Sequence, residues 1–250
     1  MPMEHTVRSY DEELRRLGNT LTQMGGLAES QLAAAIQAVA RRDGVLAAEI
    51  VATDMRVDQL ETLVDQQVMR LLALRQPVGP DLREIVSSLK IASDLERIAD
   101  YAANVAKRSI ALNQTPPVRP AFAIPRMGAY AQGMIKDVLD AYVERDADRA
   151  VAVWRRDEEL DEMYTSLFRE LLTYMMEDPR SIGAATHLLF MAKNVERIGD
   201  HATNIAETVH FLVRGERLRE LRPKGDRSAA MIAPPFDGAE LDADQEVDAT

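Results

Sequence analysis

Four pairs of acidic residues, each spaced four residues apart, are the part of this sequence that could do chemistry. The pairs are Asp54 and Asp58, Glu96 and Asp100, Asp157 and Asp161, and Glu196 and Asp200. On a helix, like charges at i and i+4 share one face and destabilise it by about 0.2–0.5 kcal/mol per pair. Something must therefore neutralise them. Two answers stay open: nearby arginine and lysine side chains, or a cation held by carboxylates from adjacent helices.

Carboxylate oxygens do not identify the metal that such a site would hold. Mg²⁺, Ca²⁺, Mn²⁺, Fe and Zn²⁺ all accept oxygen ligands, so the expectation is a divalent or transition ion, with Mg, Mn, Fe or Zn as candidates. On a helical projection Glu96 and Asp100 share a partly apolar surface rather than the most exposed face. Gly199 lies between Glu196 and Asp200, where a mid-helix glycine costs about 1 kcal/mol relative to alanine and indicates a close helix approach.

The sequence gives little support for catalytic sites other than a carboxylate metal site. The chain has no cysteine, which excludes disulfides, thiolate metal sites and cysteine nucleophiles. Glu207 and His210 form one Glu-x-x-His motif, but Lys107 and Ile110 stand at the matching places of the first half, and a di-iron bundle needs two such motifs. We therefore predict no catalytic residues and no enzymatic activity. A hydrolase with a two-metal carboxylate centre is the alternative.

Long helices must position the acidic pairs. Hydrophobic residues make up 46% of the chain and aromatic residues only 5%, a balance typical of helical proteins. Apolar positions recur every three or four residues between the breakers QPVGPD (76–81), NQTPPVRPAFAIP (113–125) and MEDPRS (176–181). The pattern predicts an all-α fold with six long helices, three on each side of the proline-rich linker.

The two halves of the chain also match each other. RRDGVLA (41–47) aligns with ERDADRA (144–150) at an offset of 103 residues, and LERIADYAANVA (95–106) aligns with VERIGDHATNIA (195–206) at an offset of 100. The change of offset falls in a turn, which is the pattern of a duplication. We predict two tandem pseudo-symmetric three-helix bundles, at 1–113 and 114–222, followed by a disordered acidic tail at 223–250.

The bulk properties limit the partners. A net charge of −11 argues against a nucleic-acid binder, which would show a basic face. No apolar run reaches the roughly 18 residues of a membrane span, and the N-terminus has no apolar region typical of a signal peptide.

The repeated segments carry a resemblance to a known family. LLALRQPVGPDLREIVSSLKIASDLERIADYAANVA (71–106) and FRELLTYMMEDPRSIGAATHLLFMAKNVERIGDHATNIAE (168–207) closely resemble the PhoU family of phosphate-uptake regulators. Both repeat copies and the turns between their helices match in order. The resemblance runs from about residue 8 to residue 218 and leaves only the tail outside.

The resemblance implies a fold, a function and a set of metal ligands. It implies two three-helix bundles, a homodimer and a cytoplasmic, non-enzymatic protein. Such a protein represses the phosphate-starvation response by coupling the ATPase subunit of the phosphate ABC transporter to a sensor histidine kinase, and it reaches the membrane only through these partners. The family's acidic motifs can bind metal clusters, which carries over to the metal candidates Asp54, Asp58, Glu96, Asp100, Asp157, Asp161, Glu196 and Asp200. A plain scaffold without metal is a further alternative.

Overall fold

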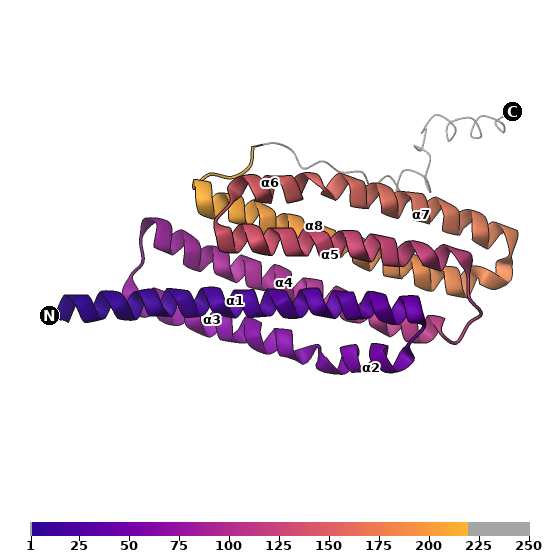
Figure 1. Ribbon diagram of the computed structural model, residues 1–250, viewed down its shortest axis with the longest axis horizontal. Helices are drawn as coiled ribbons and strands as arrows, with labels where there is room; N and C mark the ends of the chain where they lie inside the picture. Colours follow the sequence, from indigo (N-terminus) through magenta and orange to yellow (C-terminus); the bar gives the residue numbers. More distant parts are fainter. Residues whose placement is uncertain (1, 220–250) are drawn as a thin grey trace, which may run out of the picture.

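The proline- and glycine-containing breakers separate long helices, as the periodicity predicts. The computed structural model describes residues 2–219, and every regular element in that range is helical (Figure 1). The first half contains α1 (Pro2–Arg41), α2 (Gly44–Thr53), α3 (Met55–Arg75) and α4 (Gly79–Leu112). The second contains α5 (Ala123–Glu144), α6 (Ala147–Arg155), α7 (Asp157–Glu177) and α8 (Ile182–Arg214), with short 3-10 helices at Arg119–Phe122 (η1) and Pro179–Ser181 (η2).

The turn after the first helix of each half shows the duplication at atomic detail. Arg42 and Arg145, at equivalent positions, both adopt a left-handed backbone with φ of 54° and 56°. The aspartate that follows each of them caps the next helix: Asp43 accepts hydrogen bonds from the backbone N–H groups of the second and third residues after it, and Asp146 does the same. Aspartate is among the preferred residues at this position because its carboxylate satisfies orphan N–H donors.

The second helix of each bundle is interrupted, which the periodicity does not predict. α2 and α3 meet at Asp54, and α6 and α7 meet at Arg156. At these points the backbone turns more tightly, with Val57 N donating to Asp54 O at 3.1 Å and Arg156 N donating to Val153 O at 3.0 Å. Each pair of helices still follows one path, so six helical rods result as expected. The first aspartate of each Asp-x-x-x-Asp motif consequently lies at a helix boundary and not in mid-helix.

The two bundles pack side by side. α4 lies beside α8 and α1 beside α5 in the middle of the molecule, while α3 and α7 lie at opposite outer edges (Figure 1). The apolar core is continuous through these helices, with Leu95 and Ile98 of α4 and Val195 and Ile198 of α8 all buried. No helix within residues 2–219 is long and apolar enough to cross a membrane. The proposed tail at 223–250 lies outside the described residues, and the bounds 1–113 and 114–222 stay a prediction.

Candidate functional site

The acidic residues of the first half form one cluster, here called the α3–α4 cluster: Asp54, Asp58, Glu61, Glu96 and Asp100. Burial, followed by the negative charges of Asp100, Glu61 and Asp58, raises the pKa of Glu96 to about 7. The Arg97 guanidinium opposes this rise. Its Nε lies 3.5 Å from Glu96 Oε2 and its Nη1 3.7 Å from Asp100 Oδ2. The cluster is thus crowded with negative charge that one half-exposed arginine offsets.

Asp54, at the break between α2 and α3, is held by a residue of the first helix. Gln31 Nε2 donates to Asp54 Oδ1 at 2.8 Å and also lies 3.3 Å from the backbone oxygen of Ala99. Burial raises the pKa of the Asp54 carboxyl, the Gln31 hydrogen bond lowers it, and the charges of Asp100 and Asp58 raise it. Gln31 of α1 therefore contacts both Asp54, at the break between α2 and α3, and the backbone of α4.

The matching residues of the second half form the α7–α8 cluster: Asp157, Asp161, Glu196 and Asp200. This cluster is covered, since Asp157, Asp161 and Glu196 are only 1%, 3% and 5% exposed. Lys193 Nζ lies 2.8 Å from Glu196 Oε1, whereas the second oxygen of Glu196 is buried and lacks a hydrogen-bond partner among the described residues. Burial, followed by the charges of Asp200 and Asp161, raises the pKa of Glu196 to about 7 against the opposing effect of Lys193.

Close packing of α7 against α8 shapes this second cluster. A Cβ atom on Gly199 would lie 2.3 Å from Leu160 Cδ2, so any larger residue would require this buried leucine to shift. The close helix approach that Gly199 indicates is therefore real. Thr203 Oγ1, one turn further along α8, lies 3.1 Å from Asp157 Oδ1 and 2.6 Å from the backbone oxygen of Gly199. The missing side chain at Gly199 thus lets α8 approach the first turn of α7.

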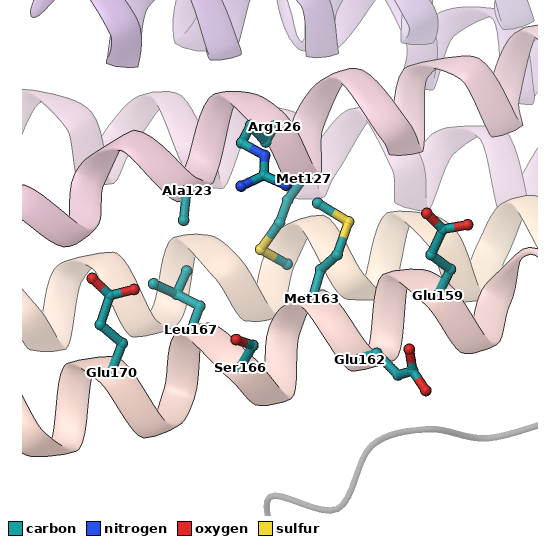
Figure 2. A pocket seen from close by; sticks show the side chains of 9 residues that line it. All are labelled: Ala123, Arg126, Met127, Glu159, Glu162, Met163, Ser166, Leu167 and Glu170. Atoms are coloured by element: carbon teal, nitrogen blue, oxygen red, sulfur yellow. The ribbon is translucent and has the colours of Figure 1, made fainter.

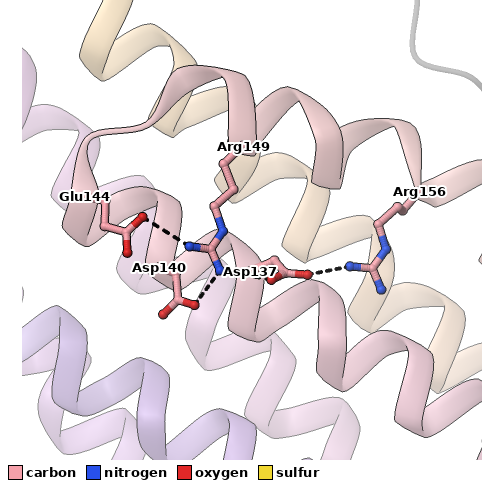
Figure 3. A network of polar contacts seen from close by, with 5 residues as sticks. All are labelled: Asp137, Asp140, Glu144, Arg149 and Arg156. Atoms are coloured by element: carbon pink, nitrogen blue, oxygen red, sulfur yellow. Dashed lines mark hydrogen bonds and ion pairs between the residues drawn. The ribbon is translucent and has the colours of Figure 1, made fainter.

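Arginines on the outer side of the second half fix the break that precedes Asp157 (Figure 3). Arg156, the residue at the break, donates to Asp137 of α5 at 2.7 Å. Arg149 of α6 contacts three carboxylates of α5 at 2.6–3.1 Å, those of Asp137, Asp140 and Glu144. These charge-assisted contacts are half-exposed, so each is weak alone, but together they hold α6 on α5. They set the position at which α7 begins.

Sequence reasoning missed the residues that compensate the carboxylates. Gln31, Lys193 and Thr203 come from positions that the duplication does not preserve: their counterparts are Met134, Ser93 and Ala103. Lys193 could have been found, because it stands three residues before Glu196 on one helix face. Gln31 and Thr203 could not, since their roles depend on how two helices meet. The amide of Asn204 donates to Asp94 of α4 at 3.3 Å.

The eight candidate residues suit a hard cation by their chemistry. Carboxylate oxygens are the ligands of Mg²⁺, Ca²⁺ and Mn²⁺, and the orphaned buried oxygen of Glu196 offers a site for one. Within the described residues, however, no three acidic or histidine side chains converge on one point that could hold a metal ion. In the α7–α8 cluster the Lys193 ammonium already contacts Glu196. A bound cation would require these side chains to rotate.

A groove lies apart from both clusters, between the start of α5 and the middle of α7 (Figure 2). It holds about 320 Å³, with Met127, Met163 and Leu167 among its apolar lining residues and Glu162 and Glu170 on its rim. None of the eight candidate residues lines it.

Comparison with known proteins assigns the family. Residues 21–109 and 124–209 each match the PhoU domain, one copy in each half of the chain. The chain belongs to the PhoU family. Both copies of the repeat lie within the matched ranges, as do all eight candidate residues.

Relatives and solved structures agree with this assignment. A phosphate-specific transport system accessory protein PhoU homolog of Caulobacter vibrioides is 56% identical over 224 residues, which cover 89% of this chain and 97% of the relative. A homolog from Xylella fastidiosa is 51% identical over 225 residues, 90% of this chain and 93% of the relative. The crystal structure of PhoU from Pseudomonas aeruginosa superimposes with a TM-score of 0.81 at 41% identity, covering 83% of this chain and all of that one.

A more distant structure has the same fold. The phosphate transport system regulatory protein PhoU of Streptococcus pneumoniae aligns with a TM-score of 0.79 at 30% identity, covering 84% of this chain and all of that one. The predictions of the family and of an all-helical fold are confirmed. Members of the family are accessory and regulatory proteins, so the prediction that this chain is not an enzyme is confirmed as well.

Proposed function

We propose that this protein is a cytoplasmic negative regulator of the phosphate-starvation response. It couples the ATPase subunit of the phosphate ABC transporter to a sensor histidine kinase and so controls phosphate uptake and homeostasis. The observation that carries the proposal is a 56% identity along 97% of a relative named as an accessory protein of the phosphate-specific transport system. The protein acts as a homodimer and reaches the membrane only through its partners.

The proposal includes a role for the acidic faces. Asp54, Asp58, Glu96 and Asp100 would hold one divalent or transition metal site, and the equivalent four residues of the α7–α8 cluster a second. A bound cation supplies positive charge that neutralises like-charged carboxylates on adjacent helices, which otherwise repel one another. Support comes from the buried Glu196 oxygen that lacks a hydrogen-bond partner among the described residues. It also comes from the pKa values of Glu96 and Glu196, which burial and neighbouring carboxylates raise to about 7.

A genetic experiment tests the regulatory role. We expect deletion of the gene to switch on phosphate-starvation genes in phosphate-rich medium, and the wild-type chain to restore repression. In parallel, the tagged chain should co-purify with the transporter ATPase and with the kinase. Normal repression after deletion would overturn the proposal.

Metal binding needs a separate test with matched variants. The protein is purified without chelator and its metal content compared between wild type, Glu96→Ala/Asp100→Ala and Glu196→Ala/Asp200→Ala. The control is Glu158→Ala/Glu162→Ala, an exposed pair with the same four-residue spacing on α7. Each cluster variant should lose metal and the control should retain it. Equal metal content in all four proteins would remove the metal role and leave a regulator that works by protein contacts alone.

A further inference from the structure

The contact line between α4 and α8 carries positive charge and aromatic rings. Arg108 of α4 stacks on Phe190 of α8, with its guanidinium carbon 4.1 Å from the ring centre. Arg197 of α8 lies 6.0 Å from the ring centre of Tyr101 of α4. The strip formed by Lys90, Tyr101, Arg108, Phe190, Arg197 and His201 is here called the basic seam.

Three cations of the basic seam lack a carboxylate partner. Lys90, Arg108 and Arg197 form no salt bridge with any residue in the range 2–219. The acidic residue of this strip, Asp94, is already bonded by His201 Nδ1 at 2.8 Å and by the amide of Asn204 at 3.3 Å. The seam is thus a positively charged strip on a chain whose net charge is −11.

The geometry of these cations prepares them for an anionic ligand. Lys90 and Arg197 are exposed, and Phe190 keeps 47% of its surface exposed. Because Arg108 stacks on the Phe190 ring, its guanidinium group is held in place while its N–H donors stay available. Binding a carboxylate there orders less side-chain freedom than binding it to a mobile arginine.

The chain itself contains a segment of matching chemistry outside the described residues. Residues 231–250, MIAPPFDGAELDADQEVDAT, carry six aspartates and glutamates and no lysine or arginine. Phe236 and Leu241 are apolar residues among these acids, and the seam has an exposed apolar ring in Phe190. Opposite charges and aligned apolar groups are what favour docking of one peptide segment on another.

The position of this segment in the chain allows the contact. α8 ends at Arg214, 17 residues beyond Arg197, which is about 26 Å along the helix. A chain can span up to about 3.3 Å per residue, so the 31 residues that follow Arg219 exceed this distance. A segment tethered at such a distance has a local concentration on the order of millimolar, which makes even weak ionic contacts effective.

We propose that the acidic segment 231–250 docks on the basic seam of its own chain. The docked segment covers the strip between the two carboxylate clusters, and an acidic segment of a partner protein would have to displace it. The inference does not depend on metal binding or on the proposed partners.

The absence of cysteine from the chain permits a direct test by disulfide trapping. Ala243→Cys in the segment is combined with Ser93→Cys, an exposed position one turn from Lys90, or with Ser30→Cys, an exposed position on α1. We expect intrachain disulfide formation to be at least about fivefold faster with Ser93→Cys, and to slow when NaCl rises from ~50 mM to ~500 mM. Equal rates at the two positions would overturn the proposal.

Charge variants establish which residues act. Lys90→Glu/Arg108→Glu/Arg197→Glu should slow trapping at Ser93→Cys about fivefold, while Arg126→Glu, an exposed arginine on α5, should leave it unchanged. If circular dichroism shows that the triple variant does not fold, Arg108→Gln/Arg197→Gln is used in its place. The variant Arg108→Lys keeps the positive charge and should trap as fast as the chain without seam substitutions. An unchanged rate in the folded seam variants, or disulfides that form only between two chains, would contradict docking within one chain.

Discussion

The two carboxylate clusters occupy equivalent positions in the two halves, yet they differ in exposure and in compensation. The side chain of Glu196 is 6% exposed and pairs with Lys193 at 2.8 Å. The side chain of Glu96 is 17% exposed, and its arginine neighbour lies 3.5 Å away and is itself 56% exposed. Asp161 is buried while its first-half counterpart Asp58 is exposed.

Substitutions around the carboxylates explain the difference. Where the first half has Glu61, the second has Tyr164, whose ring lies 4.8 Å from the Lys193 ammonium. Where the second half has Lys193, the first has the exposed Ser93. The second half thus has an internal cation and an aromatic cover, whereas the first has an additional acid. The second cluster therefore contains a close internal cation, whereas the first is offset only by the more distant and more exposed Arg97.

The largest expected effect comes from removing that internal cation. Lys193→Met keeps the apolar stem but leaves the buried Glu196 carboxylate unpaired, which should lower the free energy of unfolding at pH 8 by about 3 kcal/mol. The matched change Arg97→Met breaks only loose, exposed contacts and should cost less than about 1 kcal/mol. Urea unfolding followed by circular dichroism measures both. Equal losses would show that the two clusters are compensated to the same degree.

The dependence of the free energy of unfolding on pH should also distinguish the two clusters. The folded pKa of Glu196 is about 7 against an ordinary 4.5, so the folded state binds this proton more tightly than the unfolded state. The resulting stability is fully present below about pH 4.5 and is lost as pH rises from there to about 7, a change of about 3 kcal/mol.

The variant Glu196→Gln should therefore flatten the decline in stability between pH 5 and 8, measured by calorimetry with chelator present. Glu96→Gln should flatten it less, because solvent screens the more exposed Glu96. If Glu96→Gln flattened the curve more, burial would not be the main cause of the difference.

Helix packing offers a third comparison. Gly199 and Leu160 in the second half correspond to Ala99 and Val57 in the first. The smaller residue on α8 is thus matched by a larger residue on α7, and the reverse holds in the first half. Gly199→Ala should cost about 1–2 kcal/mol, because overpacking against the buried leucine exceeds the gain in helix propensity.

The double variant Gly199→Ala/Leu160→Val reproduces the first-half pair and should regain most of this loss. A coupling of about 1 kcal/mol in the double-mutant cycle is the expected result. Additive effects of the two changes would mean that the compensation is not local to this contact.

The sequence was sufficient for the architecture because the periodicity and the duplication act over whole helices. The bundles, the turns and the positions of the acidic pairs follow from spacing alone. The interruptions at Asp54 and Arg156 do not, since neither position carries a proline or glycine, and the contacts of Arg156 with α5 appear only once the helices are packed. The unequal burial of Asp58 and Asp161 likewise depends on which neighbouring side chains cover them.

The smallest expected effect concerns the residue that holds Asp54. Gln31→Met places in the first half the residue that Met134 provides in the second, and it removes the donor at 2.8 Å from Asp54 Oδ1. Because Asp54 is only half-buried, water can replace part of the lost hydrogen bond, and the cost should be about 0.5–1 kcal/mol. The pKa of the Asp54 carboxyl should rise further, since the Gln31 hydrogen bond lowers it. NMR titration of that carboxyl, with Gln132→Met as a control on α5, measures the shift; an unchanged or lower pKa would show that Gln31 does not stabilise the ionised form.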